Sequence, residues 1–586
     1  MWTRNRSSLT IAVVTVVALL GIGWIVGSGH VQAIGDDYYE NLNLLNQITT
    51  QIRMKYVDEI NAKHAINSAI RGMLDTLDPY TEFLEKKEND EMKMMQIQGK
   101  YGGLGIKIAK QDKSLIVVSL FEDTPAYNAG IQTGDRIVKI EGRTTADFDV
   151  TQAADLLRGE PGTAVSLAVE RDGVDAPIDY RIVRAIITIP VIQYAGVIQD
   201  DIGYLKLNQF TEDSGAEVDR ALRRLQTTRV SGLILDLRHN PGGLLEQAVT
   251  VASKFLESGR LIVYTKGRDK DQDKEYRASG SAGVRDLPLV VLVDEYSASA
   301  SEIVAGAIQD WDRGVVIGTT TYGKALVQQI FPMSNGTALK ITTARYYTPS
   351  GRLIQKMTRT ARDGEDSTAV HAPAEPSTAP PAKKEQFRTH AGRFVYGGGG
   401  VTPDVEVKSP ASPRLVNELT NHQMFINFAT HYTAAHKDFD RATFRVDDAM
   451  IAAFKTFLAE RRFTYKTDAE LELEKLEGMA KERKFDAAVL RTITVLRDQL
   501  QAQRDAEFEA NRDLIEGKIG AEVTAKLWGS EGRYTYALQH DPQVLAGVDM
   551  LKDPQKYKQS LSAQKPETKR TGALPSRTRE AVVGVE

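Results

Sequence analysis

Ser299 is the residue whose type and position best suit a nucleophile. It follows an apolar stretch at 289–293 and precedes a helical pattern whose apolar face carries Ile303, Ala307 and Trp311. A serine at such a junction lies at the positive end of the helix dipole, where backbone N–H groups can also stabilise an oxyanion. The competing interpretation is structural, because Ser299 and Glu302 also fit a capping box in which the serine only closes the helix. This segment alone favours the cap.

Lys324 is a candidate base, in the sequence Tyr-Gly-Lys beyond a second apolar stretch at 315–319. If the chain crosses the same sheet twice, Lys324 can return to the side of Ser299. Gln328 is four residues after Lys324, so the two side chains share a face in either a helix or a strand. The competing interpretation is a solvated loop lysine. A lysine accepts a proton only when neutral, so its pKa must fall from about 10.4 to about 7–8. Burial among the apolar residues 325–327 and beside the neutral Gln328 is compatible with that change.

A third segment could supply oxyanion donors. The stretch Asp-Leu-Arg-His-Asn-Pro-Gly-Gly at 236–243 is expected to end a buried strand in a tight turn. The N–H groups of its glycines could face an oxyanion, and α/β folds place ligands at the carboxyl edge of a parallel sheet. Nucleophile, base and donors are thus expected at one edge.

A separate glycine-rich segment is suited to binding a chain end. Tyr101 is followed by Gly102, Gly103, Leu104, Gly105 and Ile106, which can present successive N–H groups to a terminal carboxylate. The adjoining strand edge can accept a peptide by β-augmentation, whereas ordinary turn glycines are the alternative. Short period-two runs at 115–120, 136–140 and 165–169, with a helical stretch at 150–158, predict a β-rich module of about 90 residues.

The elements around these segments follow from hydrophobic periodicity. Residues 38–94 are helical in pattern, with Leu42, Leu45, Ile48 and Ile52 on one face. From 187 to 407 strands alternate with helices, which predicts an α/β layer structure with mostly parallel pairing. Residues 358–393 interrupt this order with prolines and scattered charge, which predicts an inserted, mobile loop.

The C-terminal third is helical in pattern from 411 to 563. Thr467 and Glu470 form a capping-box pattern that opens one long charged helix. Pairs of phenylalanines at three-residue spacing predict a packed core rather than a binding stripe: Phe425 with Phe428, and Phe454 with Phe457. Residues 564–586 are expected to be disordered.

Composition excludes several classes of function. The chain has 586 residues, a net charge of -4 and no cysteine. The length predicts several domains, and the charge argues against nucleic acid as the main partner. The lack of cysteine excludes a thiol nucleophile, disulfides and Cys-ligated zinc, and it fits an oxidising compartment. Nine scattered histidines, of which His431 and His436 form the one close pair, lack helical metal-site spacing, so no metal is expected.

The N-terminus predicts export. Arg4 and Arg6 precede an uncharged apolar stretch at 9–27, which as a helix spans about 28 Å, close to the hydrocarbon thickness of a bilayer. Cleavage after Ala33 would make it a signal peptide, but its length favours a retained anchor. The basic end stays in the cytoplasm, so the body is expected in the bacterial periplasm, anchored in the inner membrane or soluble there after cleavage.

Together these motifs resemble the C-terminal processing (tail-specific) serine proteases. The motifs that carry the resemblance are Asp-Leu-Arg-x-Asn-Pro-Gly-Gly at 236–243, Ser-Ala-Ser-Ala-Ser-Glu at 297–302, Tyr-Gly-Lys at 322–324 with Gln328, Thr-Pro-Ser-Gly-Arg at 348–352 and Gly-Gly-Val-Thr-Pro-Asp at 399–404. The β-rich module resembles a PDZ domain of the bacterial, protease-associated type. The resemblance spans about 36–410 and implies a ClpP/crotonase-like α/β core with an inserted PDZ domain, an N-terminal helical segment and a C-terminal all-α extension.

The resemblance also implies roles for individual residues. It makes Ser299 the nucleophile, Lys324 the general base and Gln328 the residue that orients the lysine. It places the oxyanion hole at the backbone N–H groups of Ala300 and Gly242. The PDZ site for a substrate C-terminus falls on Gly103, Leu104, Gly105 and Ile106, and Arg158 falls where some members couple PDZ occupancy to the active site. Asp310 matches an acidic position on the nucleophile helix, although its ordinary interpretation is a solvated charge.

The chain is therefore predicted to divide into six parts. They are a signal peptide or anchor at 1–35, a helical region at 36–95, a PDZ domain at 96–186, a Ser-Lys protease core at 187–410, a helical domain at 411–563 and a tail at 564–586. The expected partners are proteins or peptides with free apolar C-termini, an adaptor protein and further copies of the chain, and no cofactor is expected. Two rivals are weaker: an inactive scaffold would not need Ser299, Lys324 and Gln328 together, and a chymotrypsin-type protease would need a Gly-x-Ser-Gly turn.

Overall fold

The computed structural model describes residues 36–563 except for 112–113, 172–173, 175, 200, 281–283, 357–384, 410–412 and 437. The chain forms two compact units, residues 1–83 and 84–586. The predicted signal or anchor segment at 9–27 and the predicted tail at 564–586 lie outside the described residues. Within the described ranges, no helix combines the length and the apolar composition that crossing a bilayer requires.

The first unit contains two helices, α2 (Asp36–Lys55) and α3 (Ala62–Leu74). Asn61 caps α3, because its side-chain oxygen accepts the backbone N–H of His64 at 3.1 Å. The apolar face predicted for α2 is exposed, and its members Leu42, Leu45, Ile48 and Ile52 keep 41–46% of their surface accessible. Strand β1 (Glu82–Leu84) follows at the boundary between the units.

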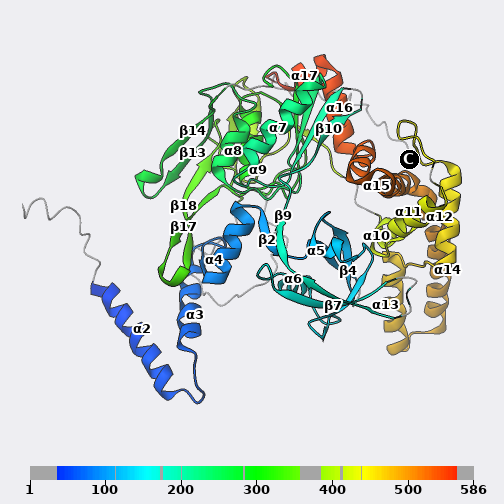
Figure 1. The fold of residues 1–586 in the computed structure, drawn as a ribbon, viewed down its shortest axis with the longest axis horizontal. Coiled ribbons are helices and arrows are strands. Elements are labelled where there is room, and N and C mark those ends of the chain that lie inside the picture. The colour runs from blue at the N-terminus through cyan, green and yellow to red at the C-terminus, as the bar shows by residue number, and fades with distance from the viewer. Residues whose placement is uncertain are drawn as a thin grey trace, which may run out of the picture. The chain divides into compact units, whose positions relative to one another are not determined.

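A six-stranded sheet of the second unit carries the segments predicted to hold the catalytic groups. Its strand order is β10-β11-β12-β15-β16-β21, with β10 antiparallel to β11 and every later pair parallel. The strands and their connecting helices are β10 (Ile192–Ile198), β11 (Ile202–Leu207), α7 (Ser214–Thr227), β12 (Gly232–Asp236), α8 (Leu245–Ala252), β15 (Leu289–Val293), α9 (Ala300–Asp310), β16 (Val315–Gly318) and β21 (Val405–Glu406) (Figure 1). The predicted α/β order with mostly parallel pairing is confirmed.

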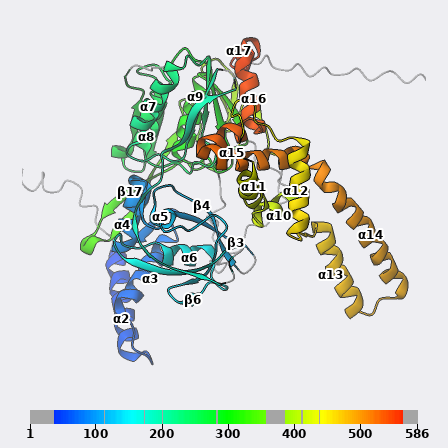
Figure 2. The ribbon, with the colours of Figure 1, turned by 45° about the vertical axis from the view of Figure 1, so that its right-hand side comes forward.

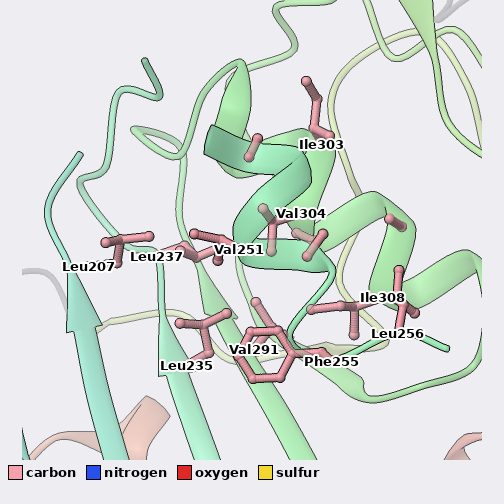
Figure 3. Packing of buried hydrophobic residues seen from close by; sticks show 14 of the residues in the cluster. Leu207, Leu235, Leu237, Val251, Phe255, Leu256, Val291, Ile303, Val304 and Ile308 are labelled. Carbon is pink, nitrogen blue, oxygen red and sulfur yellow. The ribbon is translucent and has the colours of Figure 1, made fainter. Parts of the chain in front are cut away.

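Both faces of this sheet are covered, because alternate side chains of its central strands enter two different cores. Leu235 and Val291 pack with residues of α8 and α9, as Figure 3 shows. Ile234 points to the opposite face and packs with Val548 of α16 (Pro542–Lys552). The last helices of the chain thus complete the core around the catalytic sheet.

A second, antiparallel sheet adjoins the segment that carries Lys324. It pairs β17 (Leu326–Pro332) with β18 (Ala338–Tyr347), β18 with β13 (Leu261–Gly267), and β13 with β14 (Lys274–Arg277). A register shift interrupts the β17–β18 pairing between Val327 and Gln328.

The prediction of a mobile loop over 358–393 is wrong for its last part. Strands β19 (Gln386–Arg388) and β20 (Phe394–Tyr396) form a hairpin. Arg393 of this hairpin is buried and contacts Asp312 at 2.6 Å and Asp404 at 2.5 Å, so paired charges order the segment. Residues 358–384 lie outside the described ranges.

The end of α9 is also tied by a buried ion pair. Asp310 contacts Arg352 at 2.7 Å, and both side chains are almost fully buried. The interpretation of Asp310 as a solvated charge is therefore wrong.

The predicted β-rich module is a small barrel-like sheet with two helices. Its sheet has the order β3-β4-β5-β7-β8, with β6 paired to β5, and β2 pairs separately with β9. The elements are β2 (Lys100–Gly103), β3 (Ile106–Gln111), β4 (Ser114–Leu120), α5 (Pro125–Asn128), β5 (Arg136–Ile140), β6 (Arg143–Thr144), α6 (Val150–Leu157), β7 (Ala164–Glu170), β8 (Ile178–Val183) and β9 (Ala185–Thr188), preceded by α4 (Lys86–Met92) and the π-helical turn Lys93–Ile97. Leu115, Ile137 and Val169 are fully buried in its own core.

The C-terminal region is helical, as predicted. Its helices are α10 (Arg414–Asn421), α11 (Met424–Ala435), α12 (Asp448–Glu460), α13 (Asp468–Glu482), α14 (Ala487–Ala510), α15 (Arg512–Leu538), α16 and α17 (Pro554–Ser560). The four phenylalanines at 425, 428, 454 and 457 are buried in one cluster, which confirms the core assignment. The capping box at Thr467 and Glu470 is present, and α13 lies beside α14 as a helical hairpin (Figure 2).

Candidate active site

Ser299 lies in a strained turn between β15 and α9. Its φ of +53° and ψ of -110° place a non-glycine residue in a region that L-residues rarely occupy. The turn is held in place by neighbouring hydrogen bonds: Ala298 N–H donates to the carbonyl of Asn240 at 3.1 Å, and the Ser299 carbonyl accepts Ile303 N–H at 3.0 Å. Such a turn lifts a side chain out of the strand-to-helix connection, and Ser299 remains partly accessible.

Glu302 joins the Ser299 turn to the Lys324 segment. One carboxylate oxygen, Oε2, accepts the backbone N–H groups of both Ser299 and Lys324, each at 2.9 Å. The other oxygen accepts Gly323 N–H at 2.8 Å and the Thr321 hydroxyl at 2.5 Å. The capping interpretation therefore covers only part of what Glu302 does. The structure brings the backbones of Ser299 and Lys324 together at a single oxygen atom.

Glu302 is buried, whereas most glutamates lie at the protein surface, and its pKa is raised as a result. Its side chain is fully buried, and burial raises its pKa to about 7, although the hydrogen bonds from Thr321 and from the three backbone N–H groups oppose this rise. The four donors all require an acceptor, so the ionised form fits the observed geometry.

Tyr346 contacts the same two residues from the carbonyl side. Its hydroxyl lies 2.6 Å from the carbonyl oxygen of Lys324 and 3.1 Å from that of Ser299. Burial raises the pKa of Tyr346 well above its ordinary value, so the phenol stays protonated and acts as a donor.

The 236–243 segment lies against the Ser299 turn, as its place at the sheet edge predicts. Gly242 has a φ of +99°, and a Cβ there would come within 2.6 Å of the Ala298 carbonyl oxygen and 2.9 Å of the Ala300 nitrogen. Only glycine fits so close an approach. The Gly242 N–H donates to Asn240 Oδ1 at 2.9 Å, so it is available to an oxyanion only when that bond opens.

Asn240 is the residue that fixes this turn. Its side chain is fully buried, and its amide donates to the carbonyl of Leu207 at 2.9 Å. Its own carbonyl accepts the hydroxyl of Ser301 at 2.9 Å as well as the Ala298 N–H. Asn240 therefore ties the end of β11, the glycine turn and the nucleophile turn together.

A buried charge cluster lies at the start of the same segment. Burial would raise the pKa of Asp236, but Arg238 and Lys206 hold it well below its ordinary value. Tyr204 also donates to Asp236 at 2.5 Å. Arg238 extends from this cluster to α16, where Asp541 accepts a hydrogen bond at 2.8 Å.

Gln328 lies in β17 and its side-chain amide donates to the hydroxyl of Thr342 in β18 at 3.2 Å. Lys324 precedes strand β17, which begins only at Leu326, and a register shift between Val327 and Gln328 further separates the two residues. The simple four-residue face expected from the sequence is thus interrupted.

The predicted chain-end site is a cavity of about 200 Å³ in the β-rich module. Its lining comes from the glycine-rich segment and β3, from α6 and from Arg158, and it includes the four predicted residues. The lining residues are Tyr101, Gly103, Leu104, Gly105, Ile106, Lys107, Ile108, Val150, Ala154, Leu157 and Arg158. The Arg158 guanidinium lies 5.7 Å from the ring centroid of Tyr101. Apolar walls and glycine backbone suit an apolar residue with a free carboxylate.

Some residues of the site were not identified from the sequence. Asn240 and Glu302 were noticed only as members of a turn and a cap, and Tyr346 was not singled out. The asparagine directly before Pro-Gly-Gly is a local signal for a connecting role, because an asparagine amide can both donate and accept hydrogen bonds and so can join several segments. Tyr346 gives no such signal, since an aromatic residue in a strand is ordinary core.

Four known protein families match parts of the chain. They are peptidase family S41 at residues 201–365, a PDZ domain at 116–171, the C-terminal helical domain of probable PDZ-proteases at 415–551 and the N-terminal domain of the activating protease CtpB at 28–88.

Individual proteins match over more than half of the chain. A carboxy-terminal-processing protease of Bartonella bacilliformis is 41% identical over 321 residues, which are 54% of this chain and 73% of the relative. The carboxy-terminal processing protease CtpB of Bacillus subtilis is 31% identical over 340 residues, 58% of this chain and 69% of the relative. Among solved structures, a photosystem II D1 C-terminal processing protease aligns with 27% identity and a TM-score of 0.36, covering 61% of this chain and 85% of its own.

Proposed function

The chain belongs to the carboxy-terminal processing proteases of peptidase family S41 and is a serine-type peptidase, and from this premise we propose that it cleaves exported proteins near their C-termini with a Ser299–Lys324 pair. The observation that carries the pair is the shared contact with Glu302, whose Oε2 accepts the backbone N–H of both residues at 2.9 Å.

The chemistry is acyl transfer. Neutral Lys324 takes the proton of the Ser299 hydroxyl while its oxygen attacks the carbonyl carbon of the scissile peptide bond. The resulting ammonium then gives the proton to the leaving amine, and an acyl-enzyme remains. Lys324 next removes a proton from water, which attacks the ester carbon. The ester C–O bond breaks, and Lys324 returns the proton to the Ser299 oxygen, which releases the new C-terminus and regenerates the free hydroxyl and the neutral lysine. Gln328 is assigned the orienting role, acting from β17 in partnership with Thr342.

The oxyanion that forms during each attack is assigned to the N–H of Ala300 and of Gly242. Gly242 lies against Ala300, since a Cβ on it would meet the Ala300 nitrogen at 2.9 Å. Preorganised backbone donors of this kind supply a large part of the rate enhancement in acyl transfer. For Gly242 to take part, the Asn240 side chain must release its N–H when substrate binds.

Substrate selection is assigned to the PDZ domain. The 200 Å³ cavity lined by Leu104 and Ile106 holds the substrate's last apolar side chain, and the N–H groups at 103–106 hold its carboxylate. Arg158, in the wall of the same cavity, is assigned the coupling of occupancy to catalysis.

The cellular setting and assembly extend this proposal. We assign residues 9–27 to a membrane anchor that keeps the enzyme in the bacterial periplasm, with release as a soluble periplasmic protein if cleavage follows Ala33. The exposed apolar face of α2 supports a homo-oligomer, and the helices within 411–563 are the candidate adaptor site. The parallel order of β11, β12, β15 and β16 supports a ClpP/crotonase-like core inside 187–410.

A peptide assay tests the proposal. Ser299→Ala and Lys324→Ala are expected to lower kcat by a factor on the order of 10² to 10⁴ or more, while the control Lys274→Ala, an exposed lysine of β14, keeps the wild-type value. Peptides that end in an apolar residue with a free carboxylate are expected to be cleaved faster than the same peptides amidated. Full activity of Lys324→Ala contradicts the base, and equal cleavage of amidated peptides contradicts the tail specificity.

A further inference from the structure

Tyr346 is a single buried side chain that contacts the backbone of both residues of the proposed pair. It lies in β18 with 1% of its surface accessible. Its hydroxyl is 2.6 Å from the Lys324 carbonyl oxygen and 3.1 Å from the Ser299 carbonyl oxygen. Its backbone N–H also donates to the carbonyl of Ala325 at 3.0 Å, so the strand is fastened to the residue after the lysine.

We propose that Tyr346 is a positioning residue that fixes the separation between Ser299 and Lys324; this inference rests on the proposed function of that pair. The phenol has one proton and two carbonyl acceptors in reach, so it forms a three-centre hydrogen bond between them. Because only 1% of its surface is accessible, Tyr346 acts through the backbones to which it donates and not through contact with substrate.

The geometry gives Tyr346 a task that Glu302 does not perform. Glu302 binds the N–H groups of Ser299 and Lys324, whereas Tyr346 binds their carbonyl groups. The N–H and the carbonyl of one residue belong to the two peptide groups on either side of its Cα, so contacts to both restrict the φ and ψ of that residue. Glu302 and Tyr346 together therefore fix the backbone positions from which the Ser299 and Lys324 side chains extend.

Positioning of this kind is demanding at the Ser299 turn. The strained φ of +53° must be maintained by surrounding contacts, because the residue would otherwise relax to a commoner conformation. Proton transfer needs the base within about 2.6–3.2 Å of the hydroxyl, and a displacement of about 1 Å costs up to about 100-fold in rate.

Tyr346→Phe tests the inference, because it keeps the ring and removes only the hydroxyl. We expect kcat to fall about 10- to 100-fold with KM within about twofold of wild type, since substrate contacts are unchanged. The matched control is Tyr347→Phe, the neighbouring residue of β18, whose ring stacks on Tyr264 at 5.1 Å. It is expected to keep the wild-type kcat and KM.

A second variant separates positioning from packing. 4-Aminophenylalanine at position 346 restores N–H donors at the place of the hydroxyl and is expected to recover kcat to within about threefold of wild type. All rates refer to folded enzyme, quantified by circular dichroism, so that a loss of folded protein does not count as a loss of kcat. Recovery supports a role for the donor, and a 4-aminophenylalanine enzyme as slow as Tyr346→Phe contradicts it.

Running Ser299→Ala and Lys324→Ala beside these variants separates the two hypotheses. If Lys324→Ala is inactive and Tyr346→Phe has a wild-type kcat, only the positioning role fails. If Lys324→Ala retains wild-type activity, the proposed pair fails and the positioning role fails with it.

Discussion

Glu302 is the buried ionisable residue that joins the two halves of the candidate site. Its carboxylate is fully buried and accepts hydrogen bonds from the Ser299, Gly323 and Lys324 N–H groups and from Thr321, while burial raises its pKa to about 7. Tyr346 is the titratable side chain that faces it across the pair. The site thus contains a group whose charge changes close to neutral pH.

This pKa predicts a stability that falls as pH rises. A glutamate in the unfolded chain titrates near 4.3, so between about pH 4.5 and 7 the folded protein holds a proton that the unfolded chain has lost. The free energy of unfolding is expected to decrease through this window, by about 3 kcal/mol in total, and to level off above pH 7. Urea unfolding at several pH values measures the slope.

Glu302→Gln removes the titration and is expected to remove this contribution to the slope. The variant is also expected to lose activity, because its amide nitrogen would face N–H donors instead of accepting from them. Glu275→Gln, a change at an exposed strand residue, is the control that keeps the wild-type slope. A Glu302→Gln profile parallel to that of wild type would show that Glu302 does not titrate in this range.

At this scale the sequence reveals chemistry better than it reveals contacts. Ser299, Lys324 and Gly242 lie in short motifs whose residue types indicate a candidate nucleophile, base and oxyanion donor. Asn240 and Tyr346 act through partners that are distant in sequence, and those partners are set by which strands become neighbours. Periodicity gives the strands and helices, but it does not give the atoms that meet between them.

At the scale of elements, α16 reaches the catalytic segment through Arg238. Asp541, the N-cap of α16, accepts from Arg238 at 2.8 Å, and Gln543 accepts from the same nitrogen at 2.8 Å. Arg238 is bound to Asp236 at the head of the glycine turn. Helix α16 is therefore in direct contact with the segment that carries Gly242.

Asp541→Asn tests whether this contact matters to catalysis. Asparagine caps helices as well as aspartate does, so the change removes the charge beside Arg238 and preserves the cap. We expect the free energy of unfolding to fall by about 1–3 kcal/mol and kcat to fall several-fold. Urea unfolding and peptide cleavage measure the two effects.

Asp553→Asn is the matched control, because Asp553 caps α17 and, among the described residues, accepts the backbone N–H groups of Gln555 and Lys556 in that helix. Its effect on unfolding is expected to stay within about 0.5 kcal/mol, and its kcat is expected to equal that of wild type. Equal behaviour of the two variants would show that the Asp541–Arg238 contact has no influence on the turn.

Helices and strands were predicted correctly where a hydrophobic pattern continued over many residues. The prediction failed where buried ion pairs, and not apolar side chains, order the segment. The predicted alternation of strands and helices is present between Ile202 and Asp310, except at β13, β14 and β15, which follow one another in the described chain without an α-helix between them. Residues 386–393 of the hairpin fall in the segment predicted as a mobile loop, because that segment is polar in composition and its order comes from the buried Arg393 pairs. The helical pattern of 411–563 predicts that α16 is a helix, but it does not predict that α16 covers one face of the sheet.

At the scale of the whole molecule, the proposed function joins two sites in one enzyme. Arg158 lies in the wall of the PDZ cavity and stacks on Tyr101. If it couples occupancy to catalysis, Arg158→Ala is expected to lower kcat/KM at least about tenfold for peptides with a free C-terminus. Peptide binding is expected to change less, and fluorescence anisotropy on the Ser299→Ala background measures it.

Arg143→Ala is the control in the same module. Arg143 also lies over an aromatic ring, 5.2 Å from the centroid of Phe148, but it is not in the cavity wall. Its kcat/KM is expected to equal that of wild type. An Arg158→Ala enzyme as active as the Arg143→Ala enzyme would remove Arg158 from the coupling.

The two-faced burial of the catalytic sheet also has a consequence for biosynthesis. One face is covered by α8 and α9, but the other receives its cover from residues 538–551, which leave the ribosome long after Ser299 and Lys324. A nascent chain that already contains Ser299 and Lys324 therefore still exposes an apolar sheet surface. A chain truncated before residue 538 would keep that surface exposed, so we expect such truncations to aggregate.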